Sequence, residues 1–311
     1  MIQMKIISEK EIIKLVSENI NFREEIVVPV GEDASVFFPK QDCNIVATTD
    51  SMVLNTHFSS DISPFELGYI AAASNVSDLS AMGANPALAL INLTIEKPSK
   101  DYIENLIQGY NKVFKKYPVS VIGGDTTYGP QNISMTLIGY TNHNNFMVTS
   151  NAKVGDIIFI SGPIGESFLA RKNKSYHLPE IRNTLGVMLP EYANCCTDMS
   201  DGILESVNNI SKKSHVGVKI NIDKIPRNEE LDLLISNKKI TWEDIFNYGE
   251  DYELIFTVKK ENAKILKNVC SNIGLDIYEI GKIIGNNEIE FYLNNKLADI
   301  SNKEKFEHFK L

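Results

Sequence analysis

The chain has 311 residues, 43% hydrophobic and 23% charged, an ordinary globular mixture that is long enough for two domains. Its net charge of −9 excludes a general nucleic-acid binder, because neutralising phosphates needs a basic face. Four cysteines without a CxxC pair favour reduced thiols. The first residues are too charged for a signal peptide, and no apolar run approaches the ~20 residues of a membrane span. We therefore expect a cytoplasmic protein without membrane contact.

The first half of the chain predicts alternating strands and helices. Residues 5–18 have the spacing of a short amphipathic helix. Ser63 followed by Pro64 is typical of a helix start. Later helices are expected at 63–84 and 101–117, and strands at 44–50, 87–95, 119–125 and 132–141. After the first helix, the predicted order is β, α, β, α, β, β.

The polar stretch at residues 144–156 is the candidate boundary between an amino-terminal domain, 1–148, and a carboxy-terminal domain, 149–311. The second half predicts strands at 156–162, 216–222 and 254–258, helices at 203–212 and 261–272, and short strands up to Leu293. Each half contains a strand, a glycine-rich turn, an Asp-rich loop and a helix. This pattern predicts an α/β fold in two domains.

The stretch VIGGDTT, residues 121–127, is similar to a phosphate-binding loop with one part missing. We expect a strand to end here and the two glycines to form a tight turn. Such loops usually supply a lysine as counter-charge, whereas this one supplies Asp125. We interpret the stretch as part of a metal site with a nucleotide behind it.

Carboxylates recur among small and hydroxyl residues in several short stretches, including this one. The set is GEDAS (31–35), ATTDS (47–51), NVSDLSAMG (75–83), GGDTT (123–127) and TDMSDG (197–202), with a similar sixth, YGEDYEL (248–254). Oxygen ligands of this kind suit Mg²⁺. A single Asp after a strand is more often a helix cap or a turn former. Asp201 fits a cap and Asp78 fits a polar helix position, but caps explain the whole set poorly.

Seven motifs occur in the order typical of one enzyme family: GEDASV, TTD…HF, NVSDLSAMGANP, VIGGDTT, VGDIIFISGPIG, DMSDGI and GEDYEL. Each alone is weak, but together they are specific and span the chain from about Gly31 to Phe309. The sequence resembles the thiamine-monophosphate kinases. Their superfamily includes aminoimidazole ribonucleotide synthetase, selenophosphate synthetase and the hydrogenase-maturation dehydratase.

The resemblance implies an aminoimidazole ribonucleotide synthetase-like fold of two α/β domains. The amino-terminal domain would bind ATP and Mg²⁺ and form a β-barrel homodimer with its twin, and ATP would lie between the domains. Implied metal ligands are Asp33, Thr49, Asp50, Asp78, Asp125, Asp198 and Asp201. Implied nucleotide contacts are Gly123, Gly124, Asp125, Thr126 and Ser200. Implied substrate contacts are His57, Glu250, Asp251 and Phe309, and the implied catalytic residues are Asp125 and Asp201.

The implied reaction is direct, in-line, Mg-assisted phosphorylation of thiamine monophosphate by ATP, giving thiamine diphosphate. The acceptor is a phosphate monoester whose oxygen is already anionic near neutral pH, so it needs no general base. The difficulty is repulsion between two polyanions, and catalysis is then mostly positioning and charge neutralisation. A site rich in aspartates fits this problem.

Four residues depart from the family pattern. Leu54 and Asn55 replace a Glu-Gly pair before the histidine, Thr149 replaces an arginine, and Glu166 replaces an aspartate in a glycine turn. The first departure lies near the implied acceptor site, so a paralogous kinase or synthetase acting on another small phosphorylated metabolite is an alternative. A nucleotide-binding dimer without turnover is a second alternative, against which the retention of every family acid argues.

Two other superfamily members fit the sequence less well. A selenophosphate synthetase needs a reactive Cys or Sec in a glycine-rich amino-terminal context, whereas Cys43 lies in KQDCNIV. The maturation dehydratase has a functional cysteine at its carboxyl terminus, whereas this chain ends EHFKL. A lone histidine such as His57 is often structural, and its substrate role follows mostly from the resemblance.

Overall fold

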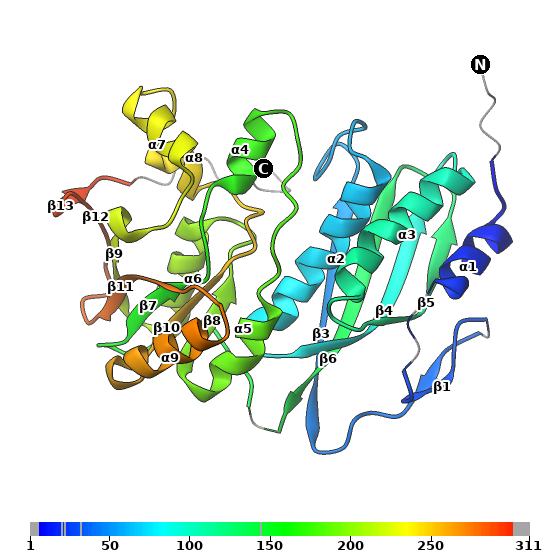
Figure 1. The fold of residues 1–311 in the computed structure, drawn as a ribbon, viewed down its shortest axis with the longest axis horizontal. Coiled ribbons are helices and arrows are strands. Elements are labelled where there is room, and N and C mark those ends of the chain that lie inside the picture. Colours follow the sequence, from blue (N-terminus) through cyan, green and yellow to red (C-terminus); the bar gives the residue numbers. More distant parts are fainter. Residues whose placement is uncertain (1–5, 20, 22, 32, 144, 301–311) are drawn as a thin grey trace. The chain divides into compact units, whose positions relative to one another are not determined.

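The computed structural model describes residues 6–19, 21, 23–31, 33–143 and 145–300, and the chain divides into two compact units (Figure 1). Unit 1 comprises Met1–Leu79 and Ala84–Phe146, and unit 2 comprises Ser80–Gly83 and Met147–Leu311. Both units contain helices and strands, which confirms the predicted two-domain α/β fold. Within the described ranges, no helix is long and apolar enough to cross a membrane.

Unit 1 is built on a four-stranded sheet with the order β3-β6-β4-β5. The strands are β3 (Cys43–Val53), β4 (Asn85–Thr94), β5 (Ser120–Thr127) and β6 (Asn132–Asn142), which confirms the four strands predicted for this half. β4 and β5 are parallel, and β6 runs antiparallel to both β3 and β4. The two edges of the sheet are therefore β3 and β5.

Two helices, α2 (Pro64–Ala81) and α3 (Lys100–Phe114), cover one face of this sheet (Figure 1). α2 begins with a capping box, in which Ser63 Oγ accepts from the Glu66 N–H and the Glu66 carboxylate accepts from the Ser63 N–H. Gly109 brings the two helices into close contact, because a Cβ there would lie 2.1 Å from the carbonyl oxygen of Phe65. The helix α1 (Glu9–Glu18) and an unpredicted pair of short strands, β1 (Ile26–Val28) and β2 (Val36–Phe37), complete the unit.

The two glycines of VIGGDTT lie inside β5, so the predicted tight turn at this point is wrong. Residues Gly123 to Thr127 continue the parallel pairing with β4. Gly124 has φ +148°, and a Cβ on it would lie 1.8 Å from the Ile91 carbonyl oxygen. Glycine is required because the neighbouring backbone leaves no room for a side chain.

Unit 2 contains a seven-stranded sheet with the order β13-β12-β9-β11-β7-β10-β8. Its strands are β7 (Ile157–Ile160), β8 (Ala193–Asp198), β9 (Gly217–Asn221), β10 (Leu254–Val258), β11 (Tyr278–Ile284), β12 (Ile289–Leu293) and β13 (Lys296–Ala298). The strands predicted at 156–162, 216–222 and 254–258 are confirmed. β8 was not predicted, because its sequence ANCCTD has few of the branched and aromatic residues typical of strands.

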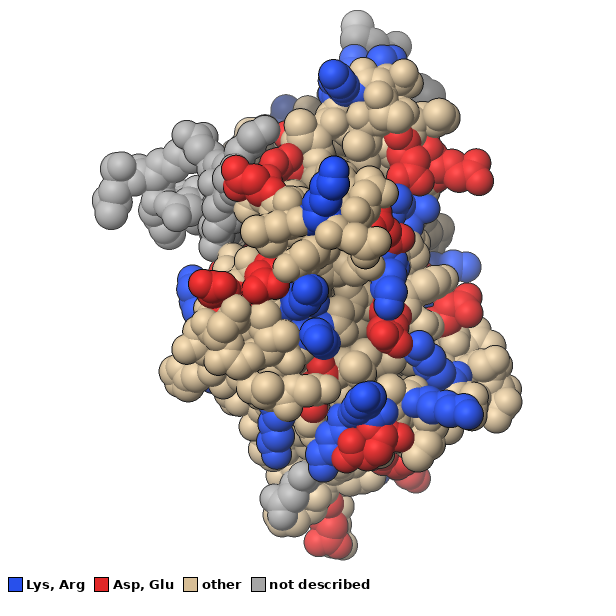
Figure 2. Space-filling view, turned by 90° about the vertical axis from the view of Figure 1, so that its left-hand side faces the viewer, with Lys and Arg blue, Asp and Glu red and all other residues tan. Residues whose placement is uncertain are grey.

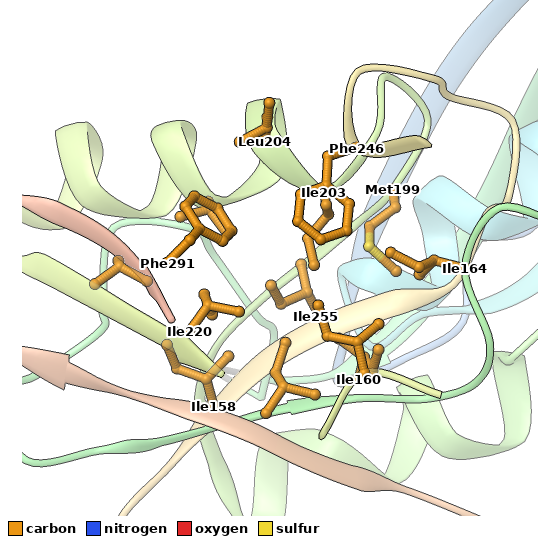
Figure 3. Close-up of a cluster of buried hydrophobic side chains, with 14 of the residues drawn as sticks. Ile158, Ile160, Ile164, Met199, Ile203, Leu204, Ile220, Phe246, Ile255 and Phe291 are labelled. Atoms are coloured by element: carbon orange, nitrogen blue, oxygen red, sulfur yellow. The ribbon is translucent and has the colours of Figure 1, made fainter. Parts of the chain in front are cut away.

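Helices pack on both faces of the second sheet. Successive buried side chains along a strand therefore belong to two different apolar clusters. Ile158 and Ile160 of β7 belong to one apolar cluster, drawn in Figure 3, and Phe159 between them belongs to another. The first cluster includes residues from α4 (Glu166–Lys172), α6 (Ile203–Ser214), α7 (Glu229–Ser236) and α8 (Trp242–Phe246). The second includes residues from α5 (Asn183–Met188), α9 (Lys260–Asn272) and the 3-10 helix η1 (Leu189–Glu191). A further 3-10 helix, η2 (Ile222–Lys224), follows β9.

The charged side chains are mixed on the surface seen in Figure 2, where Lys and Arg alternate with Asp and Glu. That face therefore lacks a broad field of one sign, of the kind that attracts a polyanion. All four cysteines of the chain are free thiols, as the sequence predicts.

Candidate functional site

In unit 1, β3 and α2 bring two of the predicted metal ligands to the same face of the sheet. Thr48 Oγ1 on β3 donates a hydrogen bond of 2.5 Å to Asp78 Oδ2 on α2. Asp50 lies two residues beyond Thr48 on the same strand, so its side chain shares that face. Both aspartates are half-buried. Two carboxylates and a hydroxyl oxygen are a donor set that suits a hard cation such as Mg²⁺.

Thr49, the hydroxyl predicted as a metal ligand, points to the opposite face. Its Oγ1 donates to the carbonyl oxygen of Met135 at 3.2 Å and accepts from Thr136 Oγ1 at 3.0 Å. Its metal role stays a prediction. Thr48, one residue earlier, contacts a predicted ligand directly and was missed. The two-residue period of a strand identifies it, because Thr48 and not Thr49 shares the face of Asp50.

Asp125 lies on the other edge strand, β5, and is exposed. Its carboxylate accepts from the Thr126 N–H and the Thr127 hydroxyl, both at 2.9 Å. The GEDAS loop approaches the same strand, because Ser35 Oγ donates to the Ile122 carbonyl oxygen at 2.5 Å. Asp33, two residues before Ser35, is exposed. The structure thus brings the GEDAS and GGDTT stretches together.

The β3 and β5 groups are separated by two intervening strands. Three inter-strand spacings of about 4.8 Å place the edge strands about 14 Å apart along the sheet. Among the described residues, no three His, Cys, Asp or Glu side chains form a group that could hold a metal ion. Asp50 and Asp125 of one chain therefore do not converge on a common ion in this arrangement.

His57 is held in a tight turn directly after β3. Its Nδ1 accepts a 3.0 Å hydrogen bond from the Val53 N–H, which puts the proton of the neutral ring on Nε2. Asn55 in this turn has φ +64°, a left-handed conformation that Asn tolerates better than most residues. The Asn at this departure from the family pattern is therefore compatible with the turn.

In unit 2, the backbone joins the TDMSDG and YGEDYEL stretches. The Met199 N–H donates to the Glu253 carbonyl at 2.9 Å, and the Glu250 N–H donates to the Ser200 carbonyl at 2.8 Å. Asp198 ends β8, and the exposed Ser200 and Asp201 follow immediately, before α6. These stretches, about 50 residues apart in the sequence, therefore form one acidic end of the second sheet.

Asp251, predicted to contact substrate, is buried and engaged by the glycine turn that precedes α4. Its carboxylate accepts from the Gly165 N–H at 2.7 Å, and from the N–H and hydroxyl of Ser167 at 2.9 and 2.8 Å. Burial raises the pKa of Asp251, and these hydrogen bonds oppose the rise. The contacts give Asp251 a structural role in fixing the start of α4. Its substrate contact stays a prediction.

Glu250, the neighbouring substrate candidate, lies near Arg171. Burial raises the pKa of the Glu250 carboxyl, the positive charge of Arg171 opposes the rise, and the negative charge of Asp251 adds to it. Glu250 also has φ +71°, an uncommon left-handed conformation for this residue type. The last substrate candidate, Phe309, lies outside the described residues.

Glu253, which the sequence did not single out, forms the central ion pair of this end of unit 2. Arg182 Nε and Nη2 donate to its two carboxylate oxygens at 2.7 and 2.6 Å, and the Ser161 hydroxyl also donates to it. Burial raises the pKa of Glu253, whereas the bonds from Arg182 and Ser161 lower it. This bidentate ion pair joins the residue before β10 to the residue before α5.

Two other departures from the family pattern have local explanations in unit 2. Thr149 Oγ1 lies 3.4 Å from the ammonium group of Lys213, so a cation remains beside this position. Glu166 is in the first turn of α4, where a carboxylate interacts favourably with the helix dipole as an aspartate would.

Comparison with known proteins assigns the chain to a family. The models of the AIR synthase related protein match residues 31–141 with the N-terminal domain and residues 153–294 with the C-terminal domain. A thiamine-monophosphate kinase of Buchnera aphidicola subsp. Acyrthosiphon pisum is 34% identical over 300 residues, which cover 90% of this chain and 92% of the relative. The chain belongs to the thiamine-monophosphate kinase family.

Solved structures of the family have the same fold. The thiamine-monophosphate kinase of Stenotrophomonas maltophilia K279a has a TM-score of 0.81 and 27% identity, covering 93% of this chain and 96% of its own. AaThiL complexed with AMPPCP and TMP has a TM-score of 0.73 and 27% identity, covering 88% of this chain and 89% of its own. The family resemblance inferred from the ordered motifs is therefore confirmed.

We predict that Glu253→Gln lowers the free energy of unfolding of the protein by about 3 kcal/mol, because it leaves the half-buried Arg182 guanidinium without its full partner. The matched control is Glu180→Gln, which removes the other carboxylate on Arg182, a side chain that is 64% exposed. The control should cost less than about 1 kcal/mol. Urea unfolding of both variants measures the difference, and equal losses would show that Arg182 does not depend on Glu253.

Proposed function

We propose that this protein transfers the terminal phosphoryl group of ATP to thiamine monophosphate, forming thiamine diphosphate and ADP. Family membership over about nine-tenths of the chain is the observation that carries this proposal. The complex of AaThiL with AMPPCP and TMP supports the same pair of substrates. The free thiols of all four cysteines support a cytoplasmic location.

The residues of unit 1 fit a site for Mg²⁺. The carboxylates of Asp50 and Asp78 with the Thr48 hydroxyl are oxygen donors of the type that this ion prefers. Bound Mg²⁺ would neutralise negative charge on the phosphates of the two substrates. The chain's own part is to hold the carboxylates in place, and the Thr48 hydrogen bond does this for Asp78. Asp33, whose loop contacts β5, is a proposed metal ligand on the Asp125 side of the sheet.

The acceptor phosphate needs orientation and not deprotonation. We propose that His57 donates from Nε2 to an acceptor oxygen, since its Nδ1 is already engaged by the Val53 N–H. Glu250, Asp251 and Phe309 are the other proposed acceptor contacts. The thiazolium ring of thiamine phosphate is a cation, so nearby carboxylates do not repel it.

We propose nucleotide contacts for each unit by itself. In unit 1 these are Gly123, Gly124, Asp125 and Thr126 on β5, where the absence of side chains at the glycines exposes the backbone. In unit 2 they are Asp198, Ser200 and Asp201, which we propose contact ATP and its metal. Asp125 and Asp201 are the proposed catalytic residues. They would hold the metal charge beside the phosphoryl group, which passes in line from ATP to the acceptor without a general base.

We further propose a homodimer in which two copies of the unit 1 sheet close into a barrel. β3 and β5 each pair with one strand only among the described elements, and both are eight residues or longer. Long open edges favour pairing with another chain. Every second residue of β3 from Ile45 to Ser51 is exposed, as expected for a strand face that awaits a partner.

We propose that the barrel closes with the β5 edge of each copy beside the β3 edge of the other. Asp125 of one copy then lies one strand spacing from the partner's β3, in place of about 14 Å within one chain. The register places the Asp125 side chain on the face of Ser51, opposite to that of Asp50, so the two carboxylates would share the nucleotide and its metal at the seam without direct contact. The proposed metal-nucleotide site is thus shared between two copies.

We predict that purified protein forms thiamine diphosphate from thiamine monophosphate and Mg-ATP, and that EDTA abolishes the reaction. The measurement is a chromatographic assay of thiamine diphosphate together with ADP, run in parallel with other phosphorylated metabolites. ADP formation with a different acceptor and no thiamine diphosphate would overturn the substrate and favour the paralogue that the changes at Leu54 and Asn55 suggest. ATP binding without transfer to any acceptor would favour the non-catalytic dimer.

We predict that Asp50→Asn and Asp125→Asn homodimers lose turnover by about 10²–10³-fold, because each loses one preorganised charge at the reacting phosphates. A heterodimer of the two variants, isolated by two different affinity tags, should recover about half of the wild-type rate. One of its two shared sites contains both substitutions and the other contains neither.

Light scattering of the wild-type protein is the control for assembly, and a monomer at micromolar concentration would contradict the dimer. A heterodimer as inactive as its parents would show that each site is built from a single chain. In that case the dimer would remain, but the shared site would be wrong.

A further inference from the structure

Unit 1 contains a cavity of about 340 Å³ at the end of the sheet opposite to the acidic residues. It is lined by Arg23, Lys40, Cys43, Asn85 and Tyr140, with the adjoining backbone of β4 and β6. Ligand pockets in proteins are about 300–1,000 Å³, so the cavity has room for a small metabolite. Cys43 is seven residues before Asp50 on β3, which puts the two about 23 Å apart along the strand. The cavity is therefore separate from the proposed metal site.

The side chain of Tyr140 provides a polar group that lacks a protein partner. The residue is 4% exposed, and its ring packs in a cluster with Ala87, Leu88 and Ile122. Its hydroxyl is buried and has no hydrogen-bond partner among the described residues. A buried hydroxyl without a partner loses its hydration without compensation, and a small shift of the Tyr140 ring toward the cavity would let a bound acceptor supply the missing hydrogen bond. Burial also raises the pKa of Tyr140, so the phenol is a neutral donor.

The charged groups around the cavity favour an anion. Lys40 is exposed, and within the described part of the chain it has no acidic partner. Arg23 donates from Nε to Glu25 and from Nη1 to the Pro118 carbonyl, both at 2.7 Å, which uses two of its five N–H donors. Two of the lining residues are cations, and Arg23 is paired with the carboxylate of Glu25. No Asp or Glu side chain is among the lining residues of the cavity.

We propose that this cavity binds a tetrahedral oxyanion, either inorganic phosphate or the phosphate group of a small monoester. The Lys40 ammonium, the remaining N–H groups of Arg23 and the Tyr140 hydroxyl are the donors, with the side-chain amide of Asn85 at the rim. Charge-assisted bonds from separate segments suit an anion whose oxygens point in several directions. The site belongs to unit 1 alone and does not depend on the proposed kinase activity.

Cys43 provides a reporter that lies inside the cavity. It is the half-buried cysteine of the chain, whereas Cys195, Cys196 and Cys270 are at most 3% exposed. Alkylation by iodoacetamide, followed by peptide mass spectrometry, therefore measures access to this cavity without using turnover. Inorganic phosphate should slow Cys43 alkylation in a saturable manner, and potassium chloride at equal ionic strength should not.

Two variants test the donors. Lys40→Gln and Tyr140→Phe should each weaken phosphate protection of Cys43 by about tenfold, since each removes one hydrogen bond to the anion. The matched control is Lys97→Gln, which changes an exposed lysine of the same unit outside the cavity. Phosphate should protect Cys43 in this variant as well as it does in the wild type. Thermal melting of each variant establishes that it is folded.

Thiamine monophosphate tested in the same assay distinguishes the two sources of the anion. Protection at lower concentration than inorganic phosphate assigns the cavity to a monoester, and weaker protection assigns it to free phosphate. The proposal is overturned if neither compound protects Cys43, or if protection survives unchanged in either cavity variant.

Discussion

Two carboxylates held on one face of a sheet are the constraint on which this account depends. Asp78 is fixed by the Thr48 hydroxyl, and Asp50 is placed beside it by the period of β3. Half-buried like charges repel one another and are costly to desolvate, unless a cation compensates for them. Such charges suit the proposed Mg²⁺, which would hold anionic phosphates together. In the proposed site, the helix and strand geometry of unit 1 positions charge and not a general base.

The strand order determines which of the proposed site residues lie close together within one chain. Because β3 and β5 are opposite edges of the sheet, the groups around Asp50 and Asp125 are separated by β6 and β4. In the proposed homodimer, a barrel made of two such sheets would bring the two edges together across the interface. Gly124 allows β5 to approach β4 so closely that no side chain would fit, and this keeps the Asp125 segment within the sheet. The proposed assembly and the proposed shared site both rest on these two edge strands.

Most of the core elements of unit 1 were predictable from the sequence, because their apolar periodicity is strong. The helix after Ser63 begins with the cap and proline that the sequence displays, and all four strands lie where predicted. β8 escaped prediction because its Cys and Thr residues have no clear strand pattern. The GGDTT turn was wrong because two glycines indicate a turn locally, whereas close contact with a neighbouring strand explains them here.

The sequence predicts a set of site residues, and their roles stay a prediction, whereas their arrangement could not be predicted from it. The ordered motifs predict the acids. Which hydroxyl contacts Asp78 depends on the two-residue period of β3, and Thr48, not Thr49, is on the face of β3 that contacts Asp78. The structural contacts of Asp251 and the ion pair of Glu253 with Arg182 join segments about 70 to 90 residues apart, beyond the reach of local pattern. The cavity at Tyr140 has no sequence motif at all, since its lining comes from five separate segments.

The most direct test of the central claim is a Mg²⁺ titration of turnover in Asp50→Asn, with a melting curve of the same sample. Asn keeps the shape of the side chain and removes its charge. The account predicts a melting curve close to that of the wild type, and a rate about 10²–10³-fold lower that excess Mg²⁺ restores only in part. A near-normal rate at ordinary Mg²⁺ with a lowered melting temperature would contradict the account, because Asp50 would then stabilise the fold and not the reaction.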